Sequence, residues 1–138
     1  MGQMQLLLVT LTVILVGIAT VVGITMVNSN VAASNADAVV SDLLDMGYKA
    51  RSYFTKPVYL RGGSRDFTGI TMNDVVPNPP FTGSIWTNDN GSYTIESKEK
   101  ELLTLKGTGN YDSDKDGQNA TFHLFVSPDS ISFATISR

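Results

Sequence analysis

The distribution of charge along the chain constrains its fold more than any other feature of the sequence. All ten Lys and Arg residues and all thirteen Asp and Glu residues lie between Asp37 and Arg138, so residues 1–36 carry no charged side chain. Within this segment Leu6–Val27 reads LLLVTLTVILVGIATVVGITMV. Its twenty-two residues would form a helix of about 33 Å, enough to cross a hydrocarbon core of about 30 Å. The N-terminal segment is therefore predicted to be a hydrophobic helix.

Polar and small residues within this segment are compatible with such a helix. The threonine hydroxyls can bond to helix carbonyl groups, so they are tolerated in lipid. Gly17 and Gly23 are weak helix positions, and they favour either close helix contact or local flexibility. The segment could be a secretory signal that is cleaved after Val31-Ala32-Ala33, a single-pass membrane anchor, or a helix that also takes part in assembly. With no Lys or Arg near either end, the flanking charges give no orientation.

The residues that follow the apolar run separate the anchor from the assembly helix. Between Ala36 and Phe54, apolar residues recur at steps of three and four, which marks one face of a helix. No proline occurs before Pro57, and the residue before a proline disfavours helix. We therefore predict one helix from about residue 3 to about residue 54, roughly 75 Å long. Its first part, 1–27, is apolar all round, and its continuation, 28–55, is amphipathic.

The C-terminal part is predicted to be a small sheet that covers the amphipathic face. Residues 56–92 are rich in Gly and Pro and form a connecting loop region. Residues 93–138 contain alternating runs such as Tyr93–Ser97 and Thr121–Ser127, separated by turns. This pattern indicates about four antiparallel strands, so the fold class is α+β: one long helix packed by its second half on an antiparallel sheet.

This layout resembles that of the type IV pilins and pseudopilins, in which a long N-terminal helix precedes a variable loop and a small sheet. The resemblance implies a structural subunit held in the inner membrane and then assembled by export machinery into a homo-oligomeric helical filament at the cell surface. The alternatives are a pseudopilin of a secretion machine and a single-pass membrane-anchored binding domain. The side chains expected to pack between subunits are Leu6, Leu7, Leu8, Val9, Leu11, Val13, Ile14, Leu15, Val16, Ile18, Val21, Val22 and Ile24.

The chain departs from the family pattern at its N-terminus. Processing after Gly2 would place Leu7 at the fifth mature position, and retention of Met1 would place Gln5 there, whereas the family carries glutamate. A charged leader, the mid-helix proline and the C-terminal disulfide of the family are also absent from the sequence. Hydrophobic packing, and not an N-terminal ion pair, is therefore expected to set the subunit register.

The remaining composition argues against catalysis and nucleic-acid binding. The chain has no cysteine and one histidine, His123, so neither a thiolate site nor a multi-histidine metal site can form within it. It carries no Walker or dinucleotide-binding motif, and its basic residues form no stripe. The chain is therefore not expected to be an enzyme.

An acidic motif near the C-terminus is the sharpest local signal. Asp112, Asp114 and Asp116 alternate and are followed by Gly117, which matches the first half of a calcium loop. Position twelve of such a loop would be His123 instead of an acidic residue, so the pattern is incomplete. The motif predicts either a calcium site, as the one cofactor that the sequence suggests, or a solvated turn.

Two further groups of residues each have two interpretations. The aromatic residues of the connecting region either contact a neighbouring subunit or anchor the loop to its own sheet: Tyr59, Phe67, Phe81 and Trp86. The acidic residues of the amphipathic helix either face water or pair with arginines of another subunit: Asp37, Asp42 and Asp45 with Arg51, Arg61 or Arg65.

Overall fold

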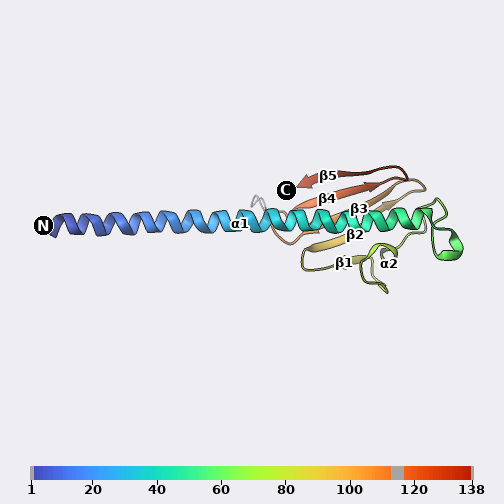
Figure 1. The fold of residues 1–138 in the computed structure, drawn as a ribbon, viewed down its shortest axis with the longest axis horizontal. Coiled ribbons are helices and arrows are strands. Elements are labelled where there is room, and N and C mark those ends of the chain that lie inside the picture. Colours follow the sequence, from blue (N-terminus) through green and yellow to red (C-terminus); the bar gives the residue numbers. More distant parts are fainter. Residues whose placement is uncertain (1, 113–116, 138) are drawn as a thin grey trace.

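The computed structural model describes residues 2–112 and 117–137, and it consists of one very long helix with a sheet beside its second half (Figure 1). Helix α1 is continuous over 54 residues. The elements in chain order are α1 (Gly2–Thr55), the 3-10 helix η1 (Val58–Leu60), α2 (Met72–Val75), β1 (Ile85–Thr87), β2 (Gly91–Lys98), β3 (Leu103–Gly109), β4 (Thr121–Val126) and β5 (Ile131–Ser137).

The strands form one antiparallel meander in the order β1-β2-β3-β4-β5. The pairing of Leu105 with Leu124, and of Leu124 with Phe133, places these apolar side chains on one face of three adjacent strands. The predicted α+β class is thus confirmed. The sheet has five strands instead of about four because Ile85–Thr87, in the region interpreted as a loop, pairs with β2.

The core lies between the second half of α1 and the sheet. The helix contributes buried residues at steps of three and four, and the strands contribute alternate residues, as expected for one covered face of each element. The helix and sheet approach closely at Gly107, where an added Cβ would lie 2.9 Å from Leu43 Cδ1. The buried core residues of these elements are Ala36, Val39, Leu43, Met46, Ala50, Phe54, Tyr93, Leu103, Leu105, Phe122, Leu124 and Val126.

The connecting region contributes side chains to the core, although it was predicted to be a surface loop. Phe67 and Ile70 are fully buried, and the Phe67 ring lies 4.6 Å from that of Phe54 between centroids. Helix α2 begins after Thr71, whose backbone N–H donates to Asp74 Oδ2 at 2.8 Å. This region therefore closes one end of the core.

Candidate assembly surface

The N-terminal half of α1 exposes an apolar surface on all sides. None of its residues before Ala32 is buried, and the large apolar side chains between Met4 and Val27 are 50–76% exposed. The helix is long and apolar enough to cross a membrane. All predicted assembly side chains lie on this part of the helix and are exposed: Leu6, Leu7, Leu8, Val9, Leu11, Val13, Ile14, Leu15, Val16, Ile18, Val21, Val22 and Ile24.

The threonine hydroxyls of this half are satisfied within the helix. The hydroxyl of Thr12 donates to Leu8 O at 2.8 Å, and that of Thr20 donates to Val16 O at 2.8 Å. Thr10 and Thr25 make the same kind of bond to carbonyl groups three or four residues earlier. Because these hydroxyls need no water, the surface suits either lipid or a dry protein interior.

The glycines of this half are not required by the fold of a single chain. Helix α1 runs unbroken through Gly17 and Gly23, and an added Cβ at either would meet no atom within 4 Å. Their expected flexibility therefore stays a prediction, as does processing at Gly2, the first described residue of the helix. Because no contact within the chain requires glycine at these two positions, they are available for close contact with another helix.

Asp42 fixes the β1–β2 hairpin to α1, a role that sequence reasoning missed. Its Oδ2 accepts hydrogen bonds from Asn88 Nδ2 at 2.8 Å, Asn90 Nδ2 at 2.8 Å and Tyr93 OH at 2.6 Å. Burial acts to raise the pKa of Asp42, but the hydrogen bonds from Asn90, Tyr93 and Asn88 outweigh it and hold that pKa below its ordinary value. Burial, aided by the bond to Asp42, raises the pKa of Tyr93. Asp42 thus belongs to the interior contact and not to the solvated face.

Asn35 makes a second polar contact between α1 and the sheet. This buried side chain donates through Nδ2 to Asn90 O at 2.7 Å and accepts through Oδ1 from Asn110 N at 3.1 Å. It therefore joins the turn between β1 and β2 to the chain after β3. Together with Asp42, it sets the position of the sheet along the helix, and hence relative to the exposed apolar half.

The acidic motif is only partly described by the structure. Asp114 and Asp116 lie in 113–116, outside the described residues, and Asp112 Oδ2 accepts a hydrogen bond from Gly117 N at 2.8 Å. Gly117 has a φ of 86°, in the left-handed region that favours glycine. Over 2–112 and 117–137, no group of three or more His, Asp or Glu residues could hold a metal. Calcium binding stays a prediction.

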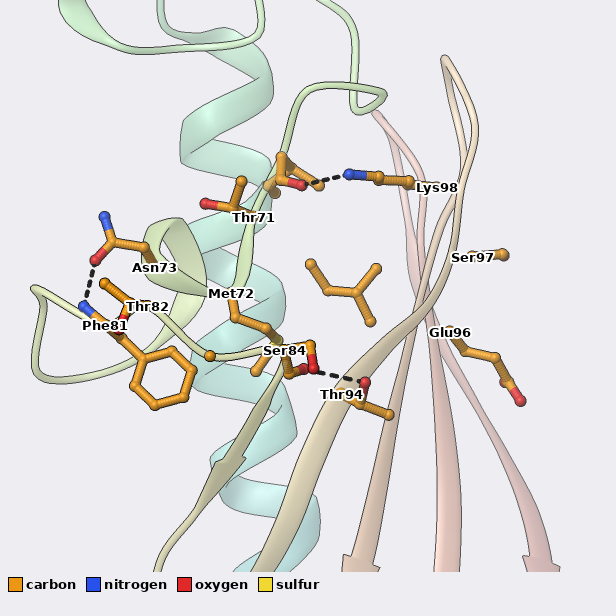
Figure 2. Close-up of a pocket in the computed structure, with 13 residues that line it drawn as sticks. Thr71, Met72, Asn73, Phe81, Thr82, Ser84, Thr94, Glu96, Ser97 and Lys98 are labelled. Carbon is orange, nitrogen blue, oxygen red and sulfur yellow. Dashed lines mark hydrogen bonds between the residues drawn. The ribbon is translucent and has the colours of Figure 1, made fainter.

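An open cavity of about 660 Å³ lies between β2 and the segment that contains α2 (Figure 2). Its polar groups mostly hold this segment to the sheet: Lys98 Nζ donates to Ile70 O at 3.1 Å, and Thr94 Oγ1 donates to Ser84 O at 3.2 Å. His123 lies elsewhere, on β4, with Nε2 3.2 Å from Glu96 Oε2. The cavity is lined by apolar side chains such as Ile95 and Phe81, and by polar side chains of which Thr94 and Lys98 already have backbone partners.

Comparison with known proteins identifies no relative: no family model, curated protein or solved structure matches the chain. The class of protein therefore rests on the architecture itself. A long N-terminal helix with an exposed apolar half, whose second half packs against a small antiparallel sheet, is a pilin-like architecture.

Proposed function

We propose that the chain is the structural subunit of an extracellular pilus-like filament, assembled by packing of its apolar N-terminal helices. One observation carries the proposal: a single 54-residue helix exposes apolar side chains on all sides in its first half and packs one face against its own sheet in its second. The sheet covers the apolar face of the second half, whereas no described part of the chain covers the first half, which is left for other chains or for lipid.

The apolar half provides the energy for assembly. Burying a Val, Leu or Ile side chain contributes about 1.5–3 kcal/mol, so thirteen side chains that are at least half exposed represent on the order of 20 kcal/mol before ordering costs. A lipid bilayer can supply the same burial to a waiting subunit. The proposal therefore includes a membrane-embedded precursor pool in the inner membrane, from which export machinery moves the subunit into the filament.

The continuity of α1 favours a filament over a simple anchor. No break separates residue 27 from the first buried residue, Ala32, so the sheet is held at a fixed position relative to the apolar half. A domain on an anchor has no need of a fixed position, whereas identical subunits in a helical assembly do. The proposed role is structural, with no catalysis and no nucleic-acid partner.

Two substitutions in the apolar half test the proposal. Val13→Lys places a charge at the buried site and should abolish fibres, while Val13→Ile should retain them. Gly17→Phe keeps the helix apolar, so membrane insertion should persist, but its bulk should reduce fibre yield by disturbing close packing. The readouts are fibres in negative-stain microscopy and carbonate-resistant membrane association. Normal fibres from Val13→Lys would contradict the proposal. Membrane insertion without fibres in the unmodified chain would favour an anchor or pseudopilin.

A further inference from the structure

The segment that follows α1 lies at the end of the molecule opposite the N-terminus (Figure 1), and it carries an exposed apolar cluster. We call residues 56–65, which follow α1, the distal tip. Here Val58, Tyr59 and Leu60 are 70%, 83% and 58% exposed. Of the four aromatic residues of the connecting region, Phe67 is buried and Phe81 and Trp86 pack on the core, which leaves Tyr59 as the one directed to solvent.

The distal tip is held in place by backbone hydrogen bonds to the end of α1. Gly63 N donates to Tyr53 O at 2.8 Å, and Arg65 N donates to Phe54 O at 2.7 Å. Arg61 and Arg65 have φ values of 59° and 71°, an uncommon left-handed conformation for residues with side chains. An apolar cluster held in this way is preorganised, and a preorganised surface loses little entropy when it binds.

The distal tip is also basic. It contains Lys56, Arg61 and Arg65, all exposed, and no acidic residue. In the part of the chain that the structure describes, no carboxylate lies within 4.0 Å of these three cationic groups. The cations therefore surround the apolar cluster with charge that a partner can neutralise.

The opposite end of the sheet carries the complementary charge. We call residues 31–37, 88–90 and 109–112, which Asn35 holds together, the proximal end. Its charged residues are all acidic: Asp37, Asp89 and Asp112. Tyr111, 50% exposed, adds an apolar surface beside them. The two ends are separated by about twenty helical residues, or roughly 30 Å.

We propose that the distal tip of one copy docks on the proximal end of the next copy, so that the Val58–Leu60 cluster is buried and its basic rim faces the aspartates. This inference rests on the proposed function, because parallel packing of the apolar helices orients both ends along one axis. The contact joins two different surfaces, so it is heterologous, and with the helices parallel each copy adds along the axis to give an open assembly instead of a ring. Asp37 of one subunit would then pair with Arg61 or Arg65 of the next subunit along the filament axis.

A disulfide experiment on the full-length chain tests this contact, because the native sequence contains no cysteine. Tyr59→Cys combined with Asp89→Cys, oxidised after detergent removal, should give a ladder of cross-linked dimers, trimers and larger species. Each single variant should remain monomeric on denaturing gels. Dimers from Tyr59→Cys alone would overturn the proposal in favour of contact between two tips.

Charge reversal provides a matched control for the same ladder. Arg61→Glu with Arg65→Glu should lower the ladder yield about tenfold, and Lys100→Glu, an exposed cation outside the distal tip, should leave it unchanged. Salt at 1 M should also lower the yield, because it screens charges beyond about 3 Å. An equal loss from Lys100→Glu would overturn the specific role of the distal tip.

Microscopy of the same samples separates this proposal from the filament itself. Fibres without a ladder would overturn the contact and leave the filament standing. A ladder without fibres would support the contact and contradict the filament. Neither fibres nor a ladder would reject both.

Discussion

Replacing Asp42 with Ala tests whether a polar contact positions the sheet on α1. The carboxylate accepts three hydrogen bonds, from Asn88, Asn90 and Tyr93, all through Oδ2. Tyr93 is fully buried, so when the carboxylate is removed its hydroxyl depends on water that enters the space left by the half-buried Asp42 side chain. Asp42→Ala therefore removes three charge-assisted bonds and leaves the Tyr93 hydroxyl with a weaker partner.

The magnitude follows from these three bonds. The buried bond from Tyr93 to a charged group contributes about 1.5–3 kcal/mol, and each half-buried Asn bond contributes about 0.5–1.5 kcal/mol. The higher helix propensity of Ala offsets part of this by about 0.5 kcal/mol. We expect Asp42→Ala to lower the free energy of unfolding of the sheet domain by about 3 kcal/mol.

Asp45→Ala is the matched control on the same helix. Asp45 is exposed, and its carboxylate pairs with Lys49 Nζ at 2.8 Å across one helical turn. Such a surface pair contributes at most about 0.5 kcal/mol. The assay is denaturant unfolding in detergent micelles, followed by the fluorescence of Trp86, the single tryptophan, whose ring centroid lies 5.2 Å from that of Tyr93.

Equal stability of the Asp42→Ala and Asp45→Ala variants would show that the three hydrogen bonds of Asp42 do not hold the sheet on α1. A double-mutant cycle with Tyr93→Phe adds a stricter requirement. Because the two side chains are hydrogen-bonded to each other, their coupling free energy should be at least about 1 kcal/mol. Additive effects would show that the contact contributes little, whatever its geometry.

Three further predictions concern acid, glycine and calcium. The pKa of Asp42 is below its ordinary value in the fold because its hydrogen bonds outweigh burial. Its contribution to the free energy of unfolding is therefore complete above about pH 4 and is lost as the pH falls through the folded-state pKa. Wild type should lose more stability than Asp42→Asn between pH 5 and pH 2, and parallel losses would contradict this. Gly91→Ala places a Cβ 2.2 Å from Thr108 O, a backbone atom, so circular dichroism should show that the sheet domain does not fold. The Cβ of Gly17→Ala meets no atom within 4 Å, so this control variant should fold. A folded Gly91→Ala variant would disprove the register of β2 and β3. Calcium at a hundred times its dissociation constant should stabilise the domain by about 2.7 kcal/mol and raise its melting temperature by several degrees relative to chelator. Asp112→Asn should reduce this shift. Equal melting temperatures in calcium and in chelator would reject the calcium site.

The long helix and its two halves could be predicted from the sequence because each has a strong pattern. The absence of charge before Asp37, apolar steps between Ala36 and Phe54, and a stop at Pro57 together specify a helix close to the Gly2–Thr55 observed. The antiparallel sheet was likewise predictable from alternation in its longer strands. These signals are local, so they need no knowledge of which segments meet.

The features that the sequence did not reveal depend on contacts between distant segments. Strand β1 has three residues, too few for a periodicity, and it is defined by its pairing with β2. Asp42 lies at the edge of the apolar face, three residues after Val39 and four before Met46, and its charge alone led to its assignment to solvent. Donors 46–51 residues later in the chain bring it into the contact with the sheet. Its place at the edge of that face and the closely spaced polar residues of the Asn88–Asn90 turn were the available signals, and the turn residues indicate a turn as readily as a contact.

Electron microscopy of the full-length chain after detergent removal tests whether the apolar halves of α1 assemble with one another. Regular fibres should persist without detergent, because the apolar half of α1 is then buried between copies. The same preparation should protect a cysteine introduced by Val13→Cys from a water-soluble maleimide. Monomers that require detergent, or vesicle-bound protein without fibres, would contradict the filament and leave the helix as a membrane anchor.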